Sequence, residues 1–179
     1  ALVDLGHHLP NANIDQIVAL LLREGKLGGF HFNDSKYGDD DLTAGALKPY
    51  QLFLIFNELV EGMDAAGLDH AKGLGWMIDA SHNLKDPLVD LLQSVEAIKI
   101  AYAQALSVDT ASLKAAQANS DVVAAQEILQ HAFRTDVRAL VAESRLQLSG
   151  AINPVKLYRG IDVRSQLISE RGFQVASGL

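Results

Sequence analysis

Three short apolar runs, each followed by an amphipathic helical segment, set the strongest limit on the fold of this chain. The runs cover residues 1–5, 28–33 and 75–80, and none of them alternates apolar with polar residues. Strands that are covered by helices on both faces have this composition. Repeated strand–helix units form a parallel sheet. The pattern therefore predicts an α/β fold, either a doubly wound sheet or part of a β/α barrel.

Apolar residues at helical spacing predict helices over residues 13–23, 49–63 and 86–106. The last of these begins with Asp86 and Pro87, a typical N-cap followed by a first-turn proline. The residues of this helix that we expect to face the core are Leu88, Leu91, Leu92, Val95 and Ile98. Further helices are expected over residues 111–118, 121–147, 154–158 and 161–170.

These elements predict two parts. Residues 1–106 would form a partial β/α barrel that carries the site residues, and residues 107–179 a helical extension for packing or oligomer contacts. Three strand–helix units are too few to close an eight-stranded barrel. The chain also opens directly in an apolar run, at Ala1, so we expect it to be a fragment of a longer protein.

Composition excludes several classes of partner and ligand. The net charge of −7 argues against binding to a nucleic-acid backbone, which needs a basic surface. No apolar run reaches the ~18 residues of a membrane span. The sequence contains no cysteine, so any metal must be held by histidines and carboxylates. Such ligands favour Mn²⁺, Mg²⁺, Co²⁺ or an open Zn²⁺ site.

Acidic and imidazole groups lie at the ends of the first two apolar runs. Asp4 ends the first run, and Gly6 allows a tight turn that would bring His7 to the same end of the sheet as Asp4. The alternative is a capping carboxylate and a surface histidine. His31 lies between Phe30 and Phe32, so its side chain must point to the opposite face of the strand. Alone it would be a core histidine, but in a barrel it would face the lumen, where a neutral imidazole can bind a cation.

Three further acidic residues and a serine complete the candidate site. Asp39 and Asp41 are two residues apart, so in an extended loop they would project to the same side, one to chelate and one to orient a water molecule. Asp79 ends the third run, and a buried carboxylate needs a metal or an arginine to neutralise it. Ser81, two residues further on, is expected to line the pocket.

Metal-assisted carbonyl chemistry fits this donor set. A divalent ion polarises a carbonyl oxygen and orients a neighbouring hydroxyl group. Interconversion of an aldose and a ketose needs this arrangement and no organic cofactor. The sequence has no glycine-rich phosphate-binding loop at the start of a helix, so we expect an unphosphorylated sugar as substrate.

The segments Val3–His8, Gly28–Asp41 and Met77–Asn83 closely resemble L-rhamnose isomerase of the bacterial, broad-specificity type, a member of the xylose-isomerase-like TIM barrels. The resemblance continues through the helical tail, including Phe133–Arg138 and Tyr158-Arg159. It implies a (β/α)8 barrel of which this chain supplies the last three strands and the C-terminal helices.

The resemblance also implies roles for individual residues. Asp4, His31 and Asp79 would bind a structural metal and, with Ser81, contact the substrate. The second, catalytic metal would be held by His7, Asp39 and Asp41. The metal is usually manganese in this family, with Co²⁺, Zn²⁺ or Mg²⁺ as alternatives, and it supports a hydride shift or a proton transfer between C1 and C2 of L-rhamnose or a related sugar.

At the level of the whole protein, the resemblance implies a homotetramer that works in cytoplasmic sugar catabolism. The family takes a further glutamate from an earlier strand and a nearby lysine, and neither has a counterpart in this chain. We therefore expect the full-length protein to be an isomerase and the isolated chain to be inactive. Two alternatives stay open: a metal-dependent endonuclease-like barrel, which the acidic balance disfavours, and a non-catalytic partial barrel whose sheet edges need a partner.

Overall fold

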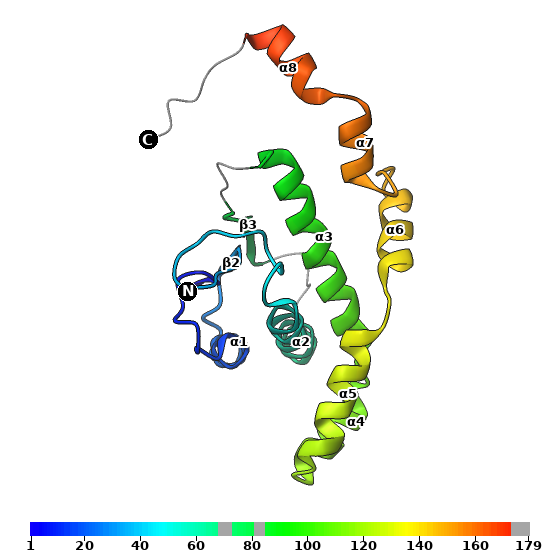
Figure 1. Cartoon of the computed structure of the whole chain (residues 1–179). Helices are drawn as coiled ribbons and strands as arrows, with labels where there is room; N and C mark the ends of the chain where they lie inside the picture. Colours follow the sequence, from blue (N-terminus) through cyan, green and yellow to red (C-terminus); the bar gives the residue numbers. More distant parts are fainter. Residues whose placement is uncertain (68–72, 81–84, 173–179) are drawn as a thin grey trace. The chain divides into compact units, whose positions relative to one another are not determined.

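The structure, a computed structural model, describes residues 1–67, 73–80 and 85–172 and divides into two compact units, Ala1–Val141 and Ala142–Leu179 (Figure 1). The first unit contains a three-stranded parallel sheet in the order β1-β2-β3. Its strands are β1 (Leu2–Asp4), β2 (Gly29–Phe32) and β3 (Gly75–Ile78). The predicted α/β class with a parallel sheet is therefore confirmed.

Three helices follow the three strands in turn: α1 (Ile14–Arg23), α2 (Pro49–Ala66) and α3 (Pro87–Leu106). In the first unit, α2 lies between α1 and α3 (Figure 1). The predicted helix starts are confirmed, because the Asn13 side chain accepts a hydrogen bond from the Gln16 N–H, and the Asp86 side chain accepts from the N–H groups of Leu88 and Val89. These caps satisfy N–H groups that have no partner inside a helix.

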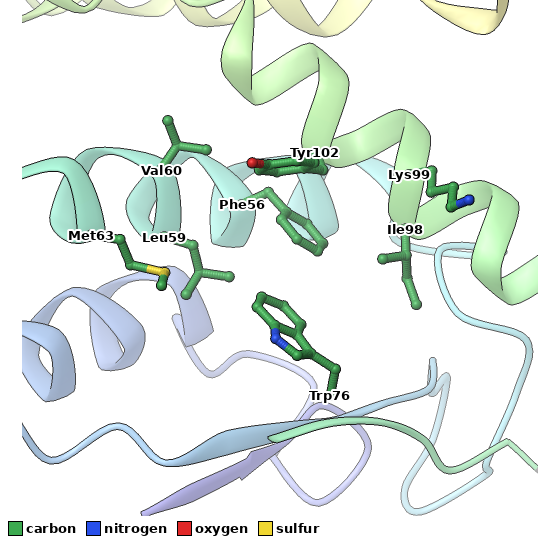
Figure 2. A pocket seen from close by; sticks show the side chains of 8 residues that line it. All are labelled: Phe56, Leu59, Val60, Met63, Trp76, Ile98, Lys99 and Tyr102. Atoms are coloured by element: carbon green, nitrogen blue, oxygen red, sulfur yellow. The ribbon is translucent and has the colours of Figure 1, made fainter. Parts of the chain in front are cut away.

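One face of the sheet packs against the helices through stacked aromatic rings. Phe30 and Phe32 are fully buried, and both rings stack on Trp76 of the neighbouring strand β3. Phe32 also stacks on Phe56 of α2, with the ring centroids 5.7 Å apart. An apolar cavity of about 260 Å³ lies beside Phe56 and Trp76, between β3, α2 and α3. Figure 2 shows the side chains that line it. The Phe-His-Phe pattern was therefore interpreted correctly, since both phenylalanines enter the core.

The opposite face of the sheet is open in the part of the chain that the structure describes. Asp4 and His31 are register partners on β1 and β2, and Met77 is the partner of His31 on β3. Side chains of partners in a parallel sheet point to the same face. Met77 is 53% exposed on this face. The expectation that all strands are covered on both faces is thus wrong for β3 in this chain.

The first turns of α3 bury a different face from the predicted one, whereas Ile98 packs against the core as predicted. Leu88, Leu91 and Val95 are exposed, whereas Asp90 and Ser94 are buried. The reason is a polar contact between α3 and the segment after β2: the Thr43 hydroxyl donates to Asp90, and the Ala44 N–H donates to the Ser94 hydroxyl. This contact turns the polar side of the first turns of α3 toward the protein.

The predicted helix over residues 121–147 is wrong, because the structure contains two helices there. After α4 (Thr110–Ala118), the chain forms α5 (Val122–Arg134) and α6 (Arg138–Gln147). Thr135 adopts an extended conformation (φ −67°, ψ 126°), and the Asp136 carboxylate accepts a hydrogen bond from the Arg138 N–H. The extended backbone at Thr135 ends α5. The Asp136 carboxylate then caps the start of α6 by accepting from a free N–H group.

The second unit contains α7 (Pro154–Gly160) and α8 (Val163–Arg171). The Arg145 guanidinium donates to the carbonyl groups of Ala151 and Ile152, which fixes the turn after α6. Among the described residues, no helix combines the length and the apolar composition that crossing a membrane requires.

Candidate metal centre

Asp4 lies at the centre of a cluster of carboxylates and imidazoles at the C-terminal ends of the strands. It is the last residue of β1, and its side chain is 7% exposed. One carboxylate oxygen, Oδ1, accepts hydrogen bonds from the Gly6 N–H and from the Asn33 side-chain amide, both at 3.0 Å. The other oxygen, Oδ2, faces two histidines. Asp4 is therefore fixed on one side and available to a ligand on the other.

The first group of potential metal ligands contains Asp4, His31 and Asp79. The His31 Nδ1 atom lies 3.0 Å from Asp4 Oδ2 and 3.1 Å from Asp79 Oδ2. Asp79 follows β3 directly, and its N–H donates to the carbonyl oxygen of Phe32. One residue from each of the three strand ends thus contributes to this group, as the sequence predicted.

The second group contains Asp4, His7 and Asp39. The His7 Nε2 atom lies 3.1 Å from Asp39 Oδ2 and 3.8 Å from Asp4 Oδ2. Both His7 and Asp39 are more than half exposed, at 61% and 54% of the side chain. His7 and Asp39 are thus together as predicted, and Asp4 is common to both groups.

Asp41 lies close to the cluster but belongs to neither three-residue group. The expectation of an extended loop from Asp39 to Asp41 is wrong, because Asp41 has a left-handed backbone (φ 48°). Its Oδ1 atom lies 3.5 Å from the Asn33 amide nitrogen. Partial burial raises the pKa of the Asp41 carboxyl, and the negative charges of Asp39, Asp79 and Asp4 raise it further. The role of Asp41 as a metal ligand stays a prediction.

Two other aspartates shape the loop that carries Asp39. Buried Asp34 accepts hydrogen bonds from the N–H groups of Ser35, Leu47 and Lys48, so it joins the two ends of the loop. Asp40 accepts from the N–H groups of Lys36, Tyr37 and Gly38, which lowers the pKa of its carboxyl. Asp34 uses both carboxylate oxygens for these loop N–H groups, and Asp40 uses its Oδ2 atom for all three.

Burial raises the pKa of the Asp4 carboxyl, but the hydrogen bonds from Asn33, His31 and Gly6 outweigh this effect, so the pKa lies below its ordinary value. Asp4 is thus held in its charged form. Asn33, which is 1% exposed, was not among the site residues predicted from the sequence. An amide carries no charge, and its only signal in the sequence is its position directly after the strand that contains His31.

The donor set fits a divalent cation. Two atoms that bind one ion at about 2.1 Å can lie at most about 4.2 Å apart, and the nitrogen–oxygen separations within the two groups are 3.0–3.8 Å. Within residues 1–67, 73–80 and 85–172, no lysine or arginine pairs with Asp4, Asp39 or Asp79. Carboxylates gathered without a cationic side chain are stabilised by a bound cation. Ser81, the remaining predicted site residue, lies outside the described residues.

Comparison with known proteins adds a relationship over almost the whole chain. No family model matches the sequence. The chain is 51% identical over 172 residues to a probable sugar isomerase of Mesorhizobium japonicum, and 52% identical over 172 residues to a probable sugar isomerase of Rhizobium meliloti. Each alignment covers 95% of this chain but 39% of the relative. Nearly all of the chain is therefore similar to about two fifths of two longer proteins that are named as probable sugar isomerases.

Proposed function

We propose that this chain supplies the metal-binding part of an aldose–ketose isomerase that acts on unphosphorylated sugars such as L-rhamnose and L-rhamnulose. The observation that carries the proposal is the position of Asp4, which is shared by two groups of potential metal ligands at one end of a parallel sheet. The similarity to probable sugar isomerases supports the isomerase class. The choice of L-rhamnose rests on the sequence resemblance alone.

The proposal includes the architecture of the whole protein. The three parallel strands would be the last part of a (β/α)8 barrel, whose lumen is the face that carries Asp4, His31 and Met77. Functional residues of such barrels lie at the C-terminal ends of the strands, where Asp4 and Asp79 are found. The remaining barrel strands and a homotetrameric assembly would belong to the longer protein.

We assign the two ions, Mn²⁺ by preference, to the two groups. Asp4, His31 and Asp79 would hold one ion, and His7, Asp39 and Asp41 the other, with Asp4 between them. A divalent ion polarises the sugar carbonyl and lowers the pKa of bound water. The buried Asp4 supplies a fixed anionic ligand, whereas exposed His7 and Asp39 lie on the side open to a substrate. In this arrangement His7 and Asp39 would hold the ion on the open side of the cluster, and that ion with its bound water would supply the chemistry that orients the sugar oxygens and moves the proton.

The test is an assay of L-rhamnose to L-rhamnulose conversion with Mn²⁺. The assay would use the 179-residue chain and a fusion in which the chain replaces the matching segment of the Rhizobium meliloti relative. We expect turnover by the fusion and none by the chain alone. His7→Gln should abolish turnover in the fusion, and the matched control His131→Gln, at an exposed position on α5, should not.

Two outcomes would reject the proposal. A folded fusion that binds Mn²⁺ and converts no aldose would remove the isomerase assignment. Binding of the chain to duplex DNA at low salt, followed by cleavage, would favour the endonuclease alternative, although the net charge of −7 opposes it. Robust turnover by the isolated chain would leave the isomerase assignment intact and show that the missing barrel strands are dispensable.

A further inference from the structure

Asn33 connects the two sets of predicted metal ligands. It follows β2 directly, and its side chain is buried between the strand ends. Its amide nitrogen lies 3.0 Å from Asp4 Oδ1 and 3.5 Å from Asp41 Oδ1. A side-chain amide has two N–H groups, so one Asn33 can donate toward both carboxylates. Asp4 and Asp41 are thereby held at a fixed separation by a neutral residue.

The space around Asn33 is defined by the turn after β1. A Cβ atom at Gly6 would lie 3.1 Å from the Asn33 amide nitrogen and 3.2 Å from its oxygen. The same atom would lie 3.2 Å from Asp39 Oδ1. Gly6 therefore makes room for Asn33 and Asp39 together, and the Asn33 amide lies against the second metal-ligand group as well as the first.

The oxygen of the Asn33 amide is the second observation. It is buried, and no donor among the described residues contacts it. Buried polar atoms in folded proteins nearly always have a partner, so an orphaned oxygen beside a functional cluster needs an explanation. A water molecule bound to a cation is a strong hydrogen-bond donor, and it would supply the partner that this oxygen lacks.

We propose that Asn33 is a positioning residue of the metal centre, which sets the separation of Asp4 and Asp41 through its N–H groups and accepts a hydrogen bond from metal-bound water through its oxygen. This inference rests on the proposed function, because it assumes that the cluster binds divalent ions. Residues in the outer shell of a metal site orient the ligands, and their replacement weakens metal binding about 10- to 100-fold.

The experiment measures Mn²⁺ binding to the 179-residue chain, with the metal ion alone as the probe. Free Mn²⁺ is followed by its electron paramagnetic resonance signal, and the spectrum of the bound ion reports its ligand geometry. The variants are Asn33→Ala and Asn33→Ser, since serine keeps one donor and leaves a smaller cavity. The matched control is Asn57→Ala, which removes another buried asparagine, located on α2 and hydrogen-bonded to Glu58.

We expect Asn33→Ala to raise the Mn²⁺ dissociation constant about 10- to 100-fold and to broaden the spectrum of the bound ion, with Asn33→Ser in between. Asn57→Ala should leave both the dissociation constant and the spectrum unchanged, even where its melting temperature falls. If Asn33→Ala does not fold, Asn33→Ser still gives the comparison.

Two results would overturn the inference in different ways. A folded Asn33 variant with the wild-type dissociation constant and spectrum would show that Asn33 plays no part in positioning the ions, while the proposed function stands. A folded fusion with the Rhizobium meliloti relative that binds no Mn²⁺ would remove the proposed function itself, and the role of Asn33 with it.

Discussion

The His31 Nδ1 atom lies 3.0 Å from Asp4 Oδ2, and the two residues are register partners on adjacent parallel strands. The pairing of β1 with β2 therefore builds this contact without help from a loop. Asp79 joins it from the end of β3, at 3.1 Å from the same nitrogen. A change of register by one residue in either strand would turn one partner to the opposite face. The sheet itself is thus the support of the candidate metal centre.

Because Asp4 belongs to both groups of potential metal ligands, its replacement should affect the binding of both ions. Asp4→Asn should weaken binding of both Mn²⁺ ions by more than about 100-fold, beyond the range of outer-shell changes. Asp79→Asn should weaken the binding of one ion, and Asp39→Asn that of the other, because each belongs to one group. Isothermal titration of each variant with Mn²⁺ measures this. Loss of both ions in the Asp79 variant would contradict the assignment of two groups.

Replacement of Asp41 should stabilise the metal-free chain. Burial and the charges of Asp39, Asp79 and Asp4 raise the pKa of Asp41, so its charged form is disfavoured in the folded state at neutral pH. Asp41→Asn should therefore raise the free energy of unfolding by up to about 1 kcal/mol, the size expected for partly solvated charge pairs. Asp40→Asn should have the opposite sign, because Asp40 accepts three loop N–H groups as a carboxylate. Urea denaturation at pH 7 with a chelator present measures the change in the free energy of unfolding for both variants.

Glu58 on α2 predicts a dependence of stability on pH. Burial raises the pKa of its carboxyl, and the charge of Glu61 raises it further. The pKa of Glu58 in the folded state thus exceeds the unfolded value of 4.5. Protonated Glu58 therefore contributes fully to the free energy of unfolding below pH 4.5, and this contribution is lost as the pH rises through the folded-state pKa. The melting temperature of Glu58→Gln should therefore rise relative to that of the wild type as the pH is increased from 4.5. The matched control is Glu127→Gln, at an exposed position on α5, which should follow the wild type.

Lys85 holds the contact between α3 and the segment after β2, so its replacement should cause a large loss of stability. The Lys85 ammonium contacts both Thr43 and Asp90, and the Asp90 side chain is 2% exposed. Lys85→Met would leave a buried carboxylate without its cation, which costs about 3 kcal/mol. The control Lys114→Met removes the pair with partly exposed Glu61, whose N–O separation is 3.3 Å, and should cost less than about 1 kcal/mol. Equal losses in the two variants, measured by chemical denaturation, would contradict this explanation.

The sequence predicted the strands and the proximity of Asp4, His31 and Asp79, because both follow from local rules. Apolar runs without alternation indicated a parallel sheet, and the ends of parallel strands meet at one edge, so Asp4, His31 and Asp79 had to converge. The placement of His7 beside Asp39 was expected from the family resemblance alone.

The errors have a different origin, since they depend on tertiary contacts. Periodicity gives α3 an apolar face that includes Leu88 and Leu91, but it does not tell whether a partner covers that face. In this chain Asp90 and Ser94 face the protein, where Asp90 accepts from Thr43 and pairs with Lys85, and Ser94 accepts from the Ala44 N–H. A neutral amide such as Asn33 gives no charge pattern, so its place between two carboxylates became visible only in the structure.

The most direct test of the central claim is the position of Mn²⁺ in crystals of the chain soaked with MnCl₂, located by anomalous diffraction. The account predicts an anomalous peak in contact with Asp4, His31 and Asp79, and a second one beside His7 and Asp39. The contrary result is an ordered cluster with these side chains paired only to one another and no manganese peak among them. That result would leave the carboxylates and imidazoles as ion pairs and remove the physical basis of the isomerase proposal.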